Sequence, residues 1–141
     1  MSWDGAGDGW DIVAREYSAA ADLARQAWET LQEARLFITS KMDGLNLKEE
    51  TLLTELFHRT MTSCFNTVCF LRARRDFERT GEMCHRNHMK EIARAEKTNA
   101  LDAVPIDEAA PWLYLAHRTD GRFASCITMI EEKSRWIDWF V

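Results

Sequence analysis

Residues that break regular structure are scarce in this chain of 141 residues, which contains two prolines and six glycines. Because proline and glycine interrupt helices and mark turns, their scarcity favours a few long helices over many short strands. The sequence also lacks an uninterrupted apolar run of about 18 residues, the length that would suggest a membrane-spanning helix. We therefore expect a helical protein with no membrane span.

A surplus of positive charge is missing as well. The chain carries 18 lysines and arginines against 23 aspartates and glutamates, for a net charge of −5. Proteins that follow a phosphate backbone usually carry a basic surplus, so general binding of nucleic acid is not expected. The first residues contain no basic and apolar segments of the secretory type, and the four cysteines form no Cys-x-x-Cys pair. These features predict a cytoplasmic protein with reduced thiols.

What the sequence does contain is the apolar periodicity of helices. Over residues 10–31 apolar side chains recur at alternating spacings of four and three, which predicts one apolar stripe along a helix. We expect this helix to end near Met42, because Asp43-Gly44 is a turn signal. A second helix is predicted over residues 46–80. Its apolar residues lie on two faces, which is typical of a central helix with more than one neighbour.

Two further helices complete the expected fold. One is predicted over residues 82–103 and the last over residues 123–140, with a less regular segment at 105–122 between them. Residues 1–9 are acidic and rich in glycine, and we expect them to be flexible. The sequence therefore predicts an all-α fold, a bundle of about four to five helices that forms a single domain over residues 10–141.

Two Glu-x-x-His motifs, Glu55 with His58 and Glu82 with His85, are the sharpest chemical pattern in the sequence. Residues three apart share one face of a helix, and such pairs supply carboxylate and imidazole ligands to di-iron centres in helical bundles. At about 1.5 Å per residue, however, His58 lies roughly 35 Å along the helix from the turn at Gly81. We therefore expect two unrelated pairs, unless the motifs meet between protomers.

A second cluster of possible metal ligands occupies residues 84–88. Cys84 and His88 are four residues apart on one helix face and could give two ligands to zinc, with His117 or Cys126 completing the site. The alternative, which we favour, is a cysteine that faces the core beside exposed histidines. We accordingly expect no tightly bound transition metal and no cofactor.

Catalytic signatures are absent from the sequence. It has no phosphate-binding loop, no dinucleotide fingerprint, no serine-hydrolase motif and no zinc-protease motif. The basic residues over 72–97 alternate with acidic ones, which is typical of a solvated helix face rather than a phosphate site. We expect no activity from the chain by itself. A concave pocket that joins ionisable side chains from different helices would reopen the enzyme class.

The C-terminal segment 136–141 is apolar nearly all round, and the chain as a whole contains six tryptophans. Soluble monomers tend to avoid large exposed apolar patches, so this segment either folds back onto the core or meets another chain, and we favour the second. The expected function is a non-catalytic interaction or accessory module that forms a homodimer or docks onto a larger partner. A metal-dependent or small-ligand-binding bundle is the alternative. The residues expected at the interface are Trp112, Tyr114, Trp136, Trp139, Phe140 and Val141.

The order of several short segments resembles a known family. A helix start at 10–17 (WDIVAREY) is followed by 96–99 (EKTN), Pro105 and 129–133 (MIEEK). This order is similar to the all-helical region that follows the catalytic barrel in large bacterial glycoside hydrolases. Residues 107–118 depart from the family pattern, which has an acidic, arginine-containing turn there. The resemblance implies a structural accessory module whose catalytic carboxylates lie in a barrel that this chain lacks, and no functional residue is carried over.

Overall fold

The computed structural model of the chain describes residues 7–110 and 126–141, and every element in these ranges is a helix. The all-α prediction is thus confirmed. No helix in the described ranges is both long enough and apolar enough to cross a membrane. The elements are α1 (Gly7–Ala34), the 3-10 turn η1 (Arg35–Phe37), α2 (Lys41–Thr80), α3 (Met83–Leu101), α4 (Val104–Ala109) and α5 (Cys126–Phe140).

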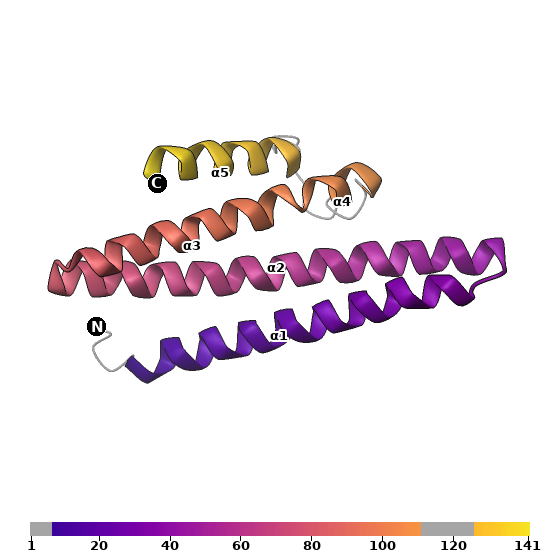
Figure 1. Cartoon of the computed structure of the whole chain (residues 1–141), viewed down its shortest axis with the longest axis horizontal. Coiled ribbons are helices and arrows are strands. Elements are labelled where there is room, and N and C mark those ends of the chain that lie inside the picture. Colours follow the sequence, from indigo (N-terminus) through magenta and orange to yellow (C-terminus); the bar gives the residue numbers. More distant parts are fainter. Residues whose placement is uncertain (1–6, 111–125) are drawn as a thin grey trace, which may run out of the picture.

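The helices form an elongated, layered bundle (Figure 1). α1 and α2 make a long antiparallel hairpin, and α3 turns back along the second half of α2. α5 lies along α3 on the side away from α1, and it contacts both α3 and α4. α2 is therefore the central helix, with α1 and α3 as its neighbours, as its two apolar faces predict.

Small side chains and a few polar contacts join α1 to α2. Ala21 and Ala24 lie on the predicted apolar stripe of α1 and are buried. The absence of bulk at these positions lets the backbones approach, and His58 of α2 donates from Nδ1 to the carbonyl oxygen of Ala21 over 3.0 Å. Nearer the open end of the hairpin, Arg72 forms an ion pair with Asp11. These two contacts set the register of the hairpin.

The turn between α1 and α2 lies earlier in the chain than the sequence predicts. α1 already ends at Ala34, and Asp43-Gly44 belongs to the first turn of α2. Ser40 explains the difference, because its backbone is extended and its Oγ accepts a hydrogen bond from the Asp43 N–H at 3.5 Å. A serine N-cap with an acidic residue three positions later resembles a capping box, and a carboxylate there is favoured by the helix dipole.

Two other boundaries also differ from expectation. α1 begins at Gly7, so residues 7–9 of the segment expected to be flexible are helical, whereas residues 1–6 lie outside the described ranges. α4 occupies the start of the segment expected to be irregular, and Pro105 stands in its first turn. Proline is well tolerated there, because a helix leaves its first N–H groups without internal partners.

The turn between α2 and α3 is tight and well defined. Gly81 has a φ of 71°, and its N–H donates to the carbonyl oxygen of Phe77 at 2.8 Å. This left-handed conformation favours glycine, and it ends α2 at the position where the sequence predicts the helix to end. Glu82 follows in an extended conformation as the N-cap of α3, and its N–H donates to Thr80 Oγ at 3.2 Å.

The core is thin and divided into two clusters. Among the described residues, seven of the twelve buried apolar side chains are alanines. One cluster joins Ala73 of α2 to Met89 and Ile92 of α3, and Phe140 of α5 packs against it. The other joins Ala100 and Ala103 to Ile130 of α5, with Val104 against it. α3 and α5 both contribute to the two clusters and so connect them.

Candidate functional site

The two Glu-x-x-His motifs do not converge within the chain. Glu55 turns to Arg59, 3.6 Å away, while His58 is held by the backbone of α1. Glu82 lies beyond the end of α2, about seven helical turns from His58. The first motif therefore serves the packing of α2, and only the second retains side chains that face one another.

Glu82, Cys84 and His85 come together at the start of α3. Glu82 Oε2 lies 3.6 Å from Cys84 Sγ and 3.6 Å from His85 Nε2, and the three ligand atoms are all within 4.8 Å of one another. Cys84 is exposed rather than directed at the core. His88, which the sequence paired with Cys84, pairs with Glu91 at 3.5 Å instead. The structure thus combines parts of two clusters that the sequence kept separate.

A buried carboxylate, Glu96, lies at the centre of the contact between α2, α3 and α5. The side chain of Glu96 is 9% exposed and forms an ion pair with Lys133 of α5. On the α2 side, Ser63 Oγ donates to Oε1 at 2.6 Å and Asn66 Nδ2 donates to Oε2 at 2.7 Å. Both carboxylate oxygens are therefore satisfied, and α5 is fastened to the other two helices through one charged group.

A cavity opens on each side of the Glu96–Lys133 pair. One, of about 270 Å³, extends toward Phe140 and is lined mostly by apolar side chains. The other, of about 390 Å³, extends toward Ala103 and also contains Arg59. These pockets bring ionisable side chains from different helices together, which is the observation that reopens the enzyme class.

The charged side chains that line these cavities are paired with one another. Lys133 Nζ lies 3.3 Å from Ser63 Oγ, but the Ser63 hydroxyl donates to Glu96 and the Lys133 ammonium is paired with the same carboxylate. Arg59 is likewise paired, with Asp102 at 3.0 Å. The arrangement holds α5 against α2 and α3.

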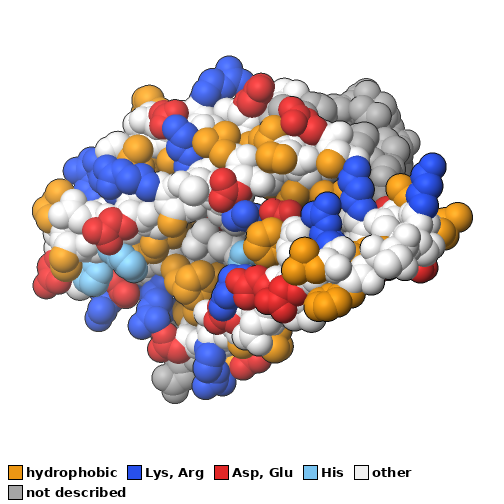
Figure 2. Space-filling model, turned by 45° about the vertical axis from the view of Figure 1, so that its right-hand side comes forward, with side chains coloured by type: hydrophobic (Ala, Val, Ile, Leu, Met, Phe, Trp, Pro, Cys, Tyr) orange, Lys and Arg blue, Asp and Glu red, His pale blue; other side chains and the backbone are white. Residues whose placement is uncertain are grey.

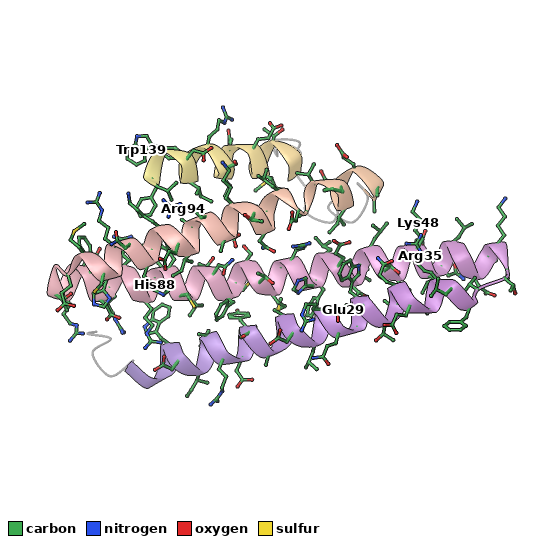
Figure 3. The ribbon with its side chains drawn as sticks, viewed as in Figure 1. Glu29, Arg35, Lys48, His88, Arg94 and Trp139 are labelled. Atoms are coloured by element: carbon green, nitrogen blue, oxygen red, sulfur yellow. The ribbon has the colours of Figure 1, made fainter. Side chains whose placement is uncertain are left out.

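The C-terminal end of α5 has two different faces. Phe140 packs edge-on against Phe70, with ring centroids 5.6 Å apart, and the Val141 carbonyl accepts from Lys90 Nζ at 3.0 Å. Trp136 and Trp139, in contrast, are 69% and 82% exposed. Their rings contact each other edge-on at 6.2 Å, and Trp139 lies at the C-terminal end of α5 (Figure 3). We call Trp136 and Trp139 the aromatic ridge. Trp112, Tyr114 and His117 lie outside the described residues.

A second apolar surface, which sequence reasoning missed, occupies the closed end of the α1–α2 hairpin. The space-filling view that brings this end forward shows apolar side chains distributed among charged ones (Figure 2). Leu36 and Phe37 come shortly after the apolar stripe of α1. These two adjacent apolar residues are the signal in the sequence that could have predicted this surface. The exposed apolar residues at this end are Leu36, Phe37, Met42 and Leu45.

The described cysteines differ in reactivity by position. Cys84 is exposed, whereas Cys64 and Cys69 are half-buried. Burial raises the pKa of the Cys69 thiol, and the nearby Arg72 guanidinium offsets this only in part. A raised pKa leaves less thiolate near neutral pH, and the thiolate is the form that is alkylated.

We therefore expect iodoacetamide to modify Cys84 at least about tenfold faster than Cys69 near neutral pH. Peptide mass spectrometry at successive times measures both rates in one sample. The ratio should narrow as the pH is raised, because Cys69 then ionises. Equal rates near neutral pH would contradict the difference in environment.

No family model, curated protein or solved structure matches the chain. The resemblance to the helical region of glycoside hydrolases therefore stays a prediction.

Proposed function

We propose that this chain is a non-catalytic helical interaction module that pairs with a second copy of itself through the aromatic ridge. The observation that carries this proposal is the exposure of Trp136 and Trp139, 69% and 82%, on a helix whose opposite face is anchored. Tryptophan is enriched among the residues that dominate binding energy at interfaces. Because Lys133 and Phe140 hold α5 in place, the ridge is presented in an ordered position, which lowers the entropic cost of association.

The thin, alanine-rich core supports association, since a second copy would bury apolar area that one copy leaves exposed.

Charge around the ridge favours a second copy over an unrelated partner. Glu132 and Arg135 line the same shallow surface as Trp136 and Trp139. In a two-fold dimer the same patch meets itself, so acidic and basic groups must complement each other across the axis. Two antiparallel copies of α5 can place Glu132 of each copy opposite Arg135 of the other. Such an interface has an aromatic centre and a charged rim, the usual anatomy of a specific contact.

The proposed setting is the cytoplasm. Cys64, Cys69 and Cys84 are free in the structure, in keeping with a reducing compartment. The proposal is non-catalytic because the ionisable groups beside the two cavities are paired with one another. A larger protein partner remains an outcome of the test rather than part of the proposal.

The test is the association of the double variant Trp136→Ser/Trp139→Ser. We expect the unmodified chain to have twice the mass of the 16.4 kDa monomer by light scattering at micromolar concentration. The double variant should be monomeric with an unchanged helical circular dichroism spectrum, because the side chains removed contribute little to the core.

Leu23→Ser is the matched control, since Leu23 is 66% exposed on α1, away from the ridge. It should leave the dimer intact. A chain that stays monomeric throughout, or a double variant that still dimerises, contradicts the proposal. Loss of the dimer only in Leu36→Ser/Phe37→Ser would assign the interface to the closed end of the hairpin instead.

A further inference from the structure

Three side chains with different metal-binding chemistry lie together at the α2–α3 turn. They are the carboxylate of Glu82, the thiol of Cys84 and the imidazole of His85, with their ligand atoms within 4.8 Å of one another. In the part of the chain that the structure describes, this is the only group of three possible ligands that converges. No residue of the proposed dimer interface belongs to this turn.

The local backbone explains why these side chains meet. Gly81 reverses the chain, and Glu82 follows in an extended conformation as the N-cap of α3. A side chain at the N-cap turns back over the first helical turn, where Cys84 and His85 are the second and third residues. The His85 N–H donates to the Glu82 carbonyl oxygen at 3.2 Å, which closes this first turn. The three ligands therefore start from an ordered helix terminus rather than from a loose loop.

The distances suit a tetrahedral ion. Zinc binds sulfur at about 2.3 Å and nitrogen or oxygen at about 2.0–2.1 Å, so its ligand atoms lie roughly 3.3–3.6 Å apart. Glu82 Oε2 is 3.6 Å from Cys84 Sγ and 3.6 Å from His85 Nε2. The third separation, between Cys84 Sγ and His85 Nε2, is no more than 4.8 Å, so rotation of these side chains can bring all three ligand atoms around one ion.

We propose that Glu82, Cys84 and His85 bind one Zn²⁺ ion, with water in the remaining position. Thiolate and imidazole ligands select zinc over calcium and magnesium, which prefer oxygen alone. Three protein ligands with an open fourth position form an accessible site rather than a closed structural one. The side chains of His85 and Glu82 are 29% and 64% exposed, so an ion reaches them from solution.

This inference revises the expectation that the chain binds no transition metal tightly. The sequence suggested Glu82 with His85 as half of an iron site, and Cys84 with His88 as half of a zinc site. In the structure Glu82 joins Cys84, and His88 faces Glu91. The regrouping follows from the N-cap position of Glu82, which lies outside the regular helical spacing.

Titration of the reduced full-length chain with Co²⁺ tests the site, because Co²⁺ reports tetrahedral thiolate coordination by its absorption. We expect saturation at one equivalent, a thiolate-to-cobalt charge-transfer band, and displacement of the cobalt by Zn²⁺. Cys84→Ser should abolish the band. Glu82→Gln and His85→Asn should each lower the affinity by about tenfold or more, at least the effect typical of losing a supporting residue.

His88→Asn is the matched control, since His88 lies on the same helix but outside the trio. The affinity of this variant for Co²⁺ should stay within about twofold of that of the unmodified chain. A second measurement is alkylation: Zn²⁺ should slow modification of Cys84 and leave Cys64 and Cys69 unchanged. The absence of a saturable thiolate band overturns the site. A loss in His88→Asn as large as that in His85→Asn overturns the ligand assignment. The ridge variant Trp136→Ser/Trp139→Ser should bind cobalt normally, which keeps this test separate from that of dimerisation.

Discussion

Replacing Lys133 by methionine is expected to lower the free energy of unfolding by about 2–4 kcal/mol. The reason is the environment of Glu96, whose side chain is 9% exposed and would lose its ionic partner. Ser63 and Asn66 would still donate to the carboxylate, but two neutral donors do not replace an ammonium group. Methionine keeps the apolar stem of the lysine, so the change isolates the charge. Urea denaturation followed by circular dichroism measures the loss.

Arg74→Met provides the comparison for this variant. Arg74 pairs with Glu78 four residues later, and both side chains are more than half exposed. Such surface pairs contribute about 0.3–0.5 kcal/mol, so Arg74→Met should be nearly neutral. Adding Glu96→Met to Lys133→Met removes both charges and should recover part of the lost stability. If Lys133→Met and Arg74→Met lowered the free energy of unfolding by the same small amount, the ion pair with Lys133 would not be needed to stabilise the buried Glu96 carboxylate.

Much of the fold follows from the sequence, because apolar periodicity is a local property. The stripe over residues 10–31 and the two apolar faces of the central helix predict α1 and α2 and their relation. The turn at residues 38–40 was misplaced because Asp43-Gly44 is a turn signal in most contexts. Here Ser40 caps the helix first and draws both residues into it. The Ser40 cap, together with the Gly44 N–H that donates to the Ser40 carbonyl oxygen at 3.0 Å, thus outweighs a general propensity.

The candidate sites follow from the sequence only in part. Spacing relates residues on one helix, so it found Glu82, Cys84 and His85, but it grouped them by helical faces. The Glu96–Lys133 pair joins two helices, and no spacing connects residues whose contact depends on how those helices pack. The same limit explains the C-terminal segment. Its composition shows an apolar excess, but only the packing of α5 shows which side chains turn inward.

Alanine substitutions at adjacent residues of the C-terminal segment should therefore have very different effects on stability. Phe140→Ala is expected to lower the free energy of unfolding by about 2–3 kcal/mol, because Phe140 packs against Phe70 and the Ala73–Met89–Ile92 cluster. It is half-buried, so the loss should be smaller than for a fully enclosed phenylalanine. Trp139→Ala, at a residue 82% exposed, should change the stability of the isolated monomer by less than about 0.5 kcal/mol.

Dependence on protein concentration distinguishes the two roles in one experiment. Association stabilises the folded state by mass action, so a residue at the dimer contact matters more as the concentration rises. Thermal unfolding at several protein concentrations should show that Phe140→Ala loses the same amount of stability, relative to the unmodified chain, at each concentration. For Trp139→Ala it should show almost no loss in dilute solution and a growing loss at higher concentration. A constant, large loss for Trp139→Ala would mean that the ridge belongs to the core, and a negligible loss for Phe140→Ala would mean that α5 is held by Lys133 rather than by its aromatic end.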